Sequence, residues 1–307
     1  MNSKGVLYGF GAYFLWGAFP LYFRLLEDSS AFEVLLHRVV WSVLACLVLV
    51  VALRHRRELT AVLAQPRRVA TLGAAAAVLA VNWGVYIYAV NSGQVIEAAL
   101  GYFINPLITV ALGVLVLRER LRRLQWAAVV VGSVAVAVLT VDYGRLPYIA
   151  LILAFSFGAY GLIKNRVGGQ VSALVGLTTE TLTLTPLALV GLVVLSVNGS
   201  QTFTSDPPWQ GLLLVSTGLV TIAPLLLFAA SASRVPLTTL GLLQYVTPTL
   251  QFLCGVTVLG EHMPLSRWLG FGLVWAALVL LTADTLRTAR ASGRAARAAE
   301  VVEPLPA

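Results

Sequence analysis

The stretch that decides the fold is VIEAALGYFINPLITVALGVLVLRERLRRLQW, residues 95–126. Its apolar part can cross a bilayer as a helix, which takes about 20 residues at about 1.5 Å each. Hydrocarbon offers the backbone no hydrogen-bond partner, so Pro106 leaves a carbonyl that a neighbouring helix or water must satisfy. Glu97, Gly101 and Asn105 recur every fourth residue and share one helical face. We expect that face to look into a helical bundle.

The same stretch recurs at a separation of 142 residues. The matched pairs are Pro106 and Pro248, Gly113 and Gly255, Leu117 and Leu259, Glu119 and Glu261, Trp126 and Trp268, Thr140 and Thr282, and Asp142 and Asp284. Apolar matches are common in a chain rich in Leu, Val and Ala. A proline, a tryptophan and two acids at one offset are not, so the sequence predicts an internal duplication.

The composition indicates an integral membrane protein. The 307 residues are 59% hydrophobic and 11% charged, whereas a soluble domain is about 25% charged. The net charge of +8 comes from bases in short loops, where they set topology, so we expect the lipid bilayer and no nucleic acid as partner. Cys46 and Cys254 lie in apolar segments, and the three histidines are scattered. We therefore expect no disulfide, metal or other cofactor.

Ten apolar segments are candidate membrane spans, which predicts an all-α polytopic fold. They cover residues 5–24, 32–53, 69–91, 95–117, 124–141, 146–164, 172–196, 209–230, 237–259 and 267–285. Of the 21 Lys and Arg residues, all but Arg24, Arg38, Arg145 and Arg267 fall on one side of these spans. Since bases accumulate in the cytoplasm, we expect both termini there, which requires an even number of spans.

Five spans per repeat is an odd number, so the second repeat should enter the membrane upside down. We expect residues 1–143 and 144–286 to form two inverted five-helix repeats. Secondary transporters often have this architecture, with the substrate near the midplane between the repeats. Residues 287–307 form a basic cytoplasmic tail that we expect to be disordered; a short helix on anionic lipid is the alternative. The first apolar segment lacks a convincing cleavage site for a signal peptide.

Charged residues within spans are the sharpest functional signal. Each costs about 2.5–3.5 kcal/mol on insertion scales, so it should face a partner or a wet cavity. Arg38 lies in the second span and Glu180 at the equivalent position of the second repeat, so the two could pair across a central cavity. The alternative is that Arg38 snorkels or binds backbone carbonyls. We place Arg38 in the substrate site as an anion or carboxylate anchor, with its neighbours His37 and Trp41, and make Glu180 its counter-charge or a proton carrier.

Other charges lie at span ends. Glu97 starts the fourth span, as a carboxylate favoured by the helix dipole or as part of a proton or cation site. Lys164 follows Tyr160 by one helical turn. We assign Glu97 and Lys164 to gating or coupling. Glu119 and Glu261 look like structural residues that pair with local arginines.

Polar and aromatic residues inside spans could wall a substrate pocket, whereas aromatics at span ends usually belong to interface belts. The further candidates for substrate binding are Trp16, Asn82, Tyr86, Tyr102, Asn105, Tyr160 and Gln244.

Several of these residues lie in motifs that resemble the RarD family: HRVVWS (37–42), NWGVYIYAV (82–90) and EAALGYFINPL (97–107). SFGAYGLIKN (156–165) and the pair Glu180 and Thr181 also fit it. RarD proteins belong to the EamA branch of the drug/metabolite transporter superfamily, and the likeness covers nearly the whole chain up to the tail. It implies ten helices, two five-helix repeats and a carrier in the cytoplasmic membrane. Family members are often labelled chloramphenicol-sensitivity proteins, while relatives in the superfamily export amino acids and other metabolites.

One departure from the family is Asn165, where a basic residue is expected; Lys164 and Arg166 flank it, so the topology is unaffected. No phosphate-binding glycine loop, metal-spaced histidine pair or serine nucleophile elbow occurs in the sequence, so we expect no enzyme. We expect a secondary transporter that exports small metabolites or drugs, chloramphenicol-related or amino-acid-like, by alternating access, with protons as a candidate coupling ion. The alternatives are a passive channel and a non-transporting membrane sensor. The oligomeric state stays open.

Overall fold

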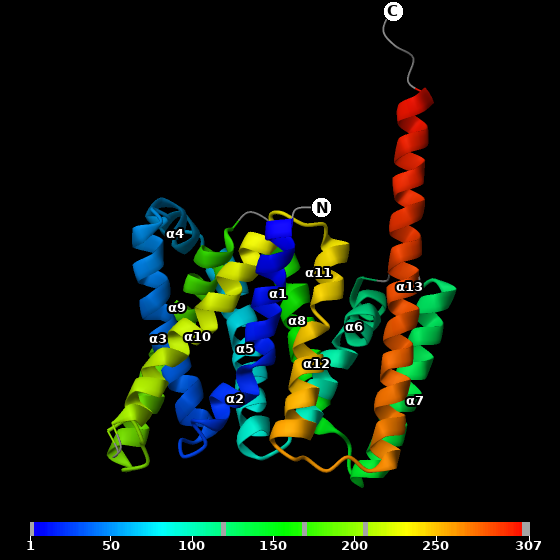
Figure 1. Cartoon of the computed structure of the whole chain (residues 1–307). Coiled ribbons are helices and arrows are strands. Elements are labelled where there is room, and N and C mark those ends of the chain that lie inside the picture. The colour runs from blue at the N-terminus through cyan, green and yellow to red at the C-terminus, as the bar shows by residue number, and fades with distance from the viewer. Residues whose placement is uncertain (1–2, 118–120, 168–170, 205–207, 303–307) are drawn as a thin grey trace, which may run out of the picture.

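The computed structural model describes residues 3–117, 121–167, 171–204 and 208–302, and every regular element in these ranges is a helix. The elements are α1 (Ser3–Gly17), α2 (Phe19–Arg24), α3 (Ala31–Ala52), α4 (Arg56–Leu63), α5 (Pro66–Asn91), α6 (Val95–Leu117), α7 (Arg123–Tyr143), α8 (Tyr148–Val167), α9 (Ala173–Val197), α10 (Trp209–Ala232), α11 (Leu237–Leu243), α12 (Val246–Leu253), the π-helix η2 (Cys254–Val258) and α13 (Leu265–Val302). Figure 1 shows that α1 begins at the end of the bundle from which α13 projects. We call this the near end, and the opposite end, where α6 begins, the far end.

The long helices match the expected spans. Among the described residues, eight are long and apolar enough to cross a membrane, one of them being α1 and α2 taken together. The expected sixth span is α8, whose apolar part (Tyr148–Lys164) is shorter. The expected ninth span consists of α11, α12 and η2. The chain is therefore an all-helical polytopic protein.

Prolines account for the broken spans. The first span breaks at Ala18, and Pro20 then lies in the first turn of α2. The ninth breaks at Gln244 and Tyr245, because Pro248 has no N–H to donate to the carbonyl of Gln244. Pro106, 142 residues before Pro248, instead lies inside a continuous α6. The same residue thus has different effects in the two halves.

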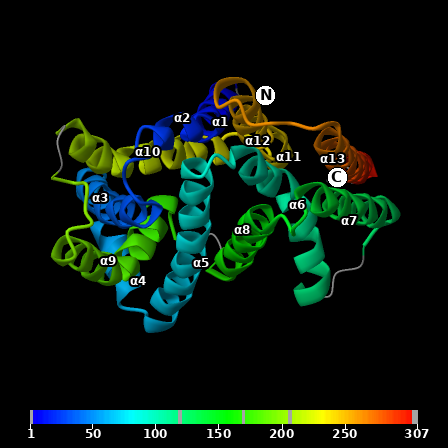
Figure 2. The same cartoon turned by 90° about the horizontal axis from the view of Figure 1, so that it is seen from below.

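The bundle is extended along one direction, as Figure 2 shows: α3 and α9 lie on one side, α7 and α13 on the other, and α5 and α8 between them. Two glycines allow close helix contacts. A Cβ on Gly101 of α6 would lie 2.8 Å from the backbone oxygen of Ala150 in α8. One on Gly218 of α10 would lie 2.5 Å from the backbone of Trp41 in α3. These approaches bring the polar side chains of facing helices within reach of one another.

Two parts of the structure differ from the sequence-based expectations. Helix α4 lies in a loop that we expected to carry only topogenic bases, and its Leu59 and Val62 are buried. Helix α13 continues to Val302, well past residue 285, so most of the basic tail is helical rather than disordered. Its alanine-rich sequence explains this, because alanine is the strongest helix former.

Candidate functional site

Arg38 of α3 carries a buried positive charge and is 3% exposed. Its Nε donates to Thr221 Oγ1 of α10 at 2.9 Å. The guanidinium carbon lies 4.0 Å from the ring centroid of Trp83, and 5.6 and 5.5 Å from those of Phe19 and Phe23. Among the described residues, no carboxylate lies within ion-pair distance of Arg38. We call these five residues the Arg38 site.

The predicted pair of Arg38 and Glu180 is therefore wrong. Glu180 of α9 instead accepts from Lys164 Nζ of α8 at 2.5 Å and from the Tyr160 hydroxyl at 3.3 Å. Tyr160 and Lys164 reach it together because they lie one turn apart on the same face of α8. The carboxylate is 2% exposed and the lysine side chain 31% exposed. Positions 142 residues apart thus carry opposite charges with separate surroundings.

Asn82 of α5 joins three helices. Its Nδ2 donates to the carbonyl of Leu153 and to the hydroxyl of Ser156, both in α8 and both at 2.9 Å. The Tyr102 hydroxyl of α6 donates to its Oδ1 at 3.3 Å. The nearby hydroxyl of Tyr86, also predicted for the site, is buried and has no hydrogen-bond partner in the described structure. Asn82 is thus held by the protein, while Tyr86 has a free polar group.

The other predicted residues lie in separate places. His37 Nδ1 accepts from Trp41 Nε1 at 3.2 Å, and its ring stacks on Phe203 at 4.8 Å. Phe203 precedes α10 and was missed, since a loop aromatic carries no periodicity. Trp16 contacts the ring of Phe228 in α10 at 5.9 Å.

The remaining two candidates lie in the spans that contain Pro106 and Pro248. Asn105 precedes Pro106 in α6, and its Oδ1 is buried without a partner in the described structure. Gln244 caps the end of α11, where the ninth span breaks. Neither side chain makes a polar contact with Arg38.

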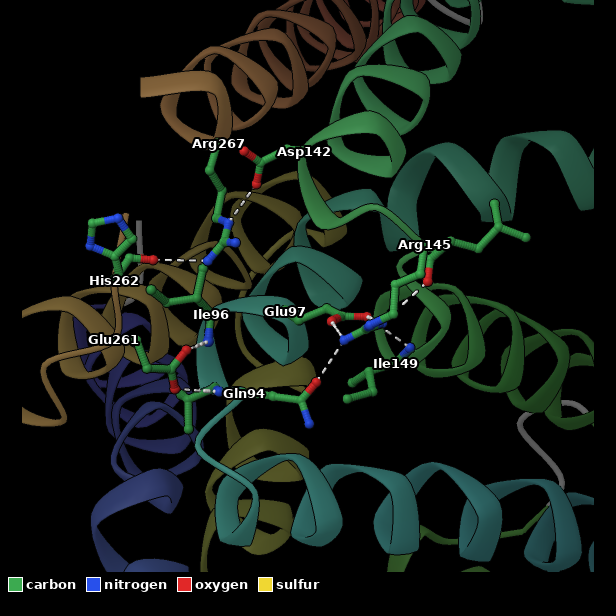
Figure 3. Close-up of polar contacts among 11 residues, drawn as sticks. Gln94, Ile96, Glu97, Asp142, Arg145, Ile149, Glu261, His262 and Arg267 are labelled. Carbon is green, nitrogen blue, oxygen red and sulfur yellow. Dashed lines mark hydrogen bonds and ion pairs between the residues drawn. The ribbon is translucent and has the colours of Figure 1, made fainter. Parts of the chain in front are cut away.

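The far end holds a second group of charges, shown in Figure 3. Glu97, 2% exposed, accepts from Arg145 Nη2 at 2.8 Å and from the backbone N–H of Ile149, at the start of α8, at 3.0 Å. Arg145 also donates to Gln94 Oε1 at 2.7 Å. Its hydrogen bonds with Glu97 raise the pKa of Arg145 above its usual value. The face of α6 carrying Glu97 therefore packs against α8, inside the bundle.

Glu261 lies in the same group (Figure 3) and accepts from the backbone N–H groups of Val95, at 2.5 Å, and Ile96, at 2.9 Å. It caps the N-terminus of α6 instead of forming the expected ion pair with an arginine. Burial raises the pKa of Glu261, and the two hydrogen bonds offset part of that rise. The expectation for Glu119 falls outside the described residues.

Arg267 Nε of α13 donates to Asp142 Oδ2 of α7 at 2.9 Å and completes this far-end polar cluster. The cluster consists of Gln94, Glu97, Asp142, Arg145, Glu261 and Arg267. It ties α6 to α8 and to the loop before α13, and it ties α7 to α13.

No group of three or more His, Cys, Asp or Glu suited to a metal occurs in the described part of the chain. Cys46 and Cys254 are buried thiols.

Comparisons with known proteins identify the family. The model of the EamA-like transporter family matches residues 3–141 and 147–283. Protein RarD of Streptomyces exfoliatus is 51% identical over 100% of this chain and 97% of its own length. The uncharacterized transporter YojE of Bacillus subtilis (strain 168) is 42% identical over 95% of this chain and 97% of its own. A solved crystal structure with 19% identity covers 92% of this chain and 98% of its own, with a TM-score of 0.60, a likeness of fold alone.

Three findings indicate the same kind of protein. The helices are long and apolar enough to span a membrane, charged residues are buried between them, and the relatives match over the full length of the chain. The chain is a multi-pass integral protein of the cytoplasmic membrane and belongs to the EamA-like transporter family, within which it is a RarD protein.

Proposed function

We propose that this membrane transporter is a secondary carrier, and that it exports small metabolites or drugs by alternating access between two inverted five-helix repeats. The repeats are residues 1–143 and 144–286, followed by a basic tail. The two separate matches to the family model support this division. So do two N-cap serines 142 residues apart, Ser30 of α3 and Ser172 of α9. With ten spans and the near end in the cytoplasm, the far end is the outer face.

The observation that carries the proposal is the hydrogen bond between Arg38 of the first repeat and Thr221 of the second. It puts a buried charge on the boundary between the two halves, where carriers of this architecture bind their substrate. In this proposal Arg38 anchors the substrate, and His37, Trp41, Trp16, Asn82, Tyr86, Tyr102, Asn105, Tyr160 and Gln244 shape the surroundings. The ring contacts of Tyr86 with Tyr102, and of Trp16 with Phe228, support an aromatic wall.

Glu97 is the proposed outer gate. Its bonds to Arg145 and Ile149 cross from the first repeat to the second, as do the bonds of Glu261 to Val95 and Ile96. Moving the two halves apart at the far end requires these bonds to break. Such bonds therefore hold one conformation of an alternating-access cycle.

Glu180 and Lys164 are the proposed coupling pair, with protons as the ion to test. A buried carboxylate with a partly exposed cationic partner can exchange that partner for a proton. The chain supplies transport rather than catalysis in this proposal. A passive channel and a membrane sensor are the alternatives that the test must separate.

Counterflow in proteoliposomes makes that separation. The purified protein is reconstituted, and uptake of labelled amino acids, phosphorylated sugars, nucleosides and chloramphenicol is measured with and without unlabelled compound inside. A carrier takes up the label faster when the inner compartment is loaded, whereas a channel shows no such acceleration and a sensor shows no uptake. Acceleration for any compound supports the proposal, and its absence for every transported compound overturns it.

A further inference from the structure

The positive charge of Arg38 is not balanced by a fixed negative charge. The nearby buried acids already have partners: Glu180 binds Lys164, Glu97 binds Arg145, and Glu33 accepts from the backbone N–H and hydroxyl of Thr202. The aromatic rings around Arg38 attract the guanidinium without neutralising it. One net positive charge is therefore left in the interior of the bundle.

The hydrogen-bond donors at this place are also in excess. Arg38 uses Nε on Thr221, while Nη1 and Nη2 have no hydrogen-bond partner among the described residues. The hydroxyl-bearing rings of Tyr22 and Tyr86 pack against Phe23, with centroids 5.3 and 6.1 Å from its own, and the Phe23 ring lies 5.5 Å from the guanidinium carbon. The Tyr86 hydroxyl is buried and without a partner. What the site lacks is an acceptor that carries negative charge.

A row of aromatic rings connects this region with the surface of the bundle. Neighbouring ring centroids are 5.8 Å apart for Tyr86 and Tyr102, 6.4 Å for Tyr102 and Phe157, and 6.2 Å for Phe157 and Tyr160. Exposure rises from 2% at Tyr86 to 41% at Phe157. Beyond Tyr160 lies Lys164, 5.8 Å from its ring. Rings in such a row favour a flat, apolar body.

From these observations we propose that the cargo is an organic monoanion: a planar carboxylate, held by Nη1 and Nη2 of Arg38 and by the Tyr86 hydroxyl, on a flat apolar body. A guanidinium binds a carboxylate through two parallel hydrogen bonds, a geometry that a neutral amide cannot reproduce. A dianion, such as a phosphate monoester, would leave one buried charge uncompensated, because Lys164 is already neutralised by Glu180. The cargo thus completes the charge balance of the site.

This inference rests on the proposed function, since it assigns a substrate class to that same site. The test is thermal stabilisation of the purified full chain by matched pairs of probes: benzoate and benzamide, cinnamate and cinnamamide, indole-3-acetate and indole-3-acetamide, with phenyl phosphate as the dianion. Each probe is tested on the wild type, on Arg38→Gln and on Tyr86→Phe. Arg24→Gln is the matched control, because Arg24 is an exposed arginine paired with Glu27.

We expect at least one acid to stabilise the wild type and the Arg24→Gln variant, and to bind them about tenfold to hundredfold more tightly than its amide. Arg38→Gln should remove that preference, and Tyr86→Phe should weaken acid binding several-fold. Three results each overturn the inference: an amide or phenyl phosphate that binds as well as the acids, acid binding that Arg38→Gln leaves intact, or no stabilisation by any acid. If counterflow is seen with neutral compounds alone, the inference of an anionic substrate is wrong, while the proposal that the protein is a carrier is still supported.

Discussion

The far-end polar cluster and the Arg38 site both hold charged side chains away from water, but the charges have different partners in the two regions. At the far end, Glu97 has Arg145, Asp142 has Arg267, and Glu261 has two backbone N–H groups. In the Arg38 site the cation has aromatic rings and one hydroxyl, and no carboxylate in the described structure. Paired charges define one arrangement of helices. An unpaired charge is instead available to bind a ligand that later dissociates.

The largest effect on stability is expected from breaking the ion pair between Glu97 and Arg145. Arg145→Gln leaves the carboxylate of Glu97 without its cation, at a cost of about 2–3 kcal/mol in the free energy of unfolding. The value lies below the range for fully buried pairs because the Arg145 side chain is 38% exposed. Unfolding of the purified protein by denaturant measures it. The double variant Glu97→Gln with Arg145→Gln should recover part of the loss, and simple addition of the two single losses would contradict a direct pair.

A smaller loss is expected when the cap of α6 is removed. Glu261→Ala deletes the acceptor for Val95 and Ile96, which should cost about 1–2 kcal/mol. The specific readout is hydrogen exchange, which should speed up at these two backbone amides. Glu261→Gln keeps one acceptor oxygen and should lie between the wild type and the alanine variant. Unchanged exchange at Val95 and Ile96 in the alanine variant would rule out the cap.

Glu58 of α4 tests a paired carboxylate that is more accessible to water. Burial alone would raise the pKa of Glu58, but the hydrogen bonds that it accepts from Ser172 and His55 outweigh burial and lower it. Its contribution is therefore present above the ordinary carboxyl pKa and is lost as the pH falls through the lowered value. Glu58→Gln should cost a few tenths of a kcal/mol at pH 7 and nothing at a pH well below the lowered pKa. A loss that grows on acidification would contradict the assigned partners.

The smallest effect on stability is expected at Tyr86, whose ring packs against Phe23 of the Arg38 site. Tyr86→Phe removes a buried hydroxyl that has no partner in the described structure, so the free energy of unfolding should change by less than about 0.5 kcal/mol. Tyr102→Phe is the comparison, because that hydroxyl donates to Asn82 and its loss should cost about 1 kcal/mol. Equal losses for both variants would mean that Tyr86 has a partner after all.

The spans and the buried charges could be predicted from the sequence, because bilayer thickness and the cost of desolvation act on each segment separately. Pairing could not. Arg38 and Glu180 occupy equivalent positions, yet Lys164 takes the carboxylate because α8 presents Tyr160 and Lys164 to α9. Glu261 caps a helix 165 residues away in sequence, and no local pattern carries that information. Phe203 was missed for the same reason.

The effects of prolines were only half predictable. Pro106 and Pro248 lie at matching positions 142 residues apart, but α6 stays continuous at Pro106, whereas the ninth span breaks before Pro248. Whether the freed carbonyl finds another partner depends on the packed neighbours.

The most direct test of the contrast between the two regions is the stability of two variants without any ligand. Arg38→Gln and Arg145→Gln make the same substitution, one at the unpaired and one at the paired arginine. We predict that Arg145→Gln lowers the free energy of unfolding by about 2–3 kcal/mol, whereas Arg38→Gln leaves it unchanged or raises it, because an uncompensated charge no longer has to be buried. If Arg38→Gln destabilises the protein as much as Arg145→Gln does, Arg38 is a structural residue and the distinction between the two regions fails.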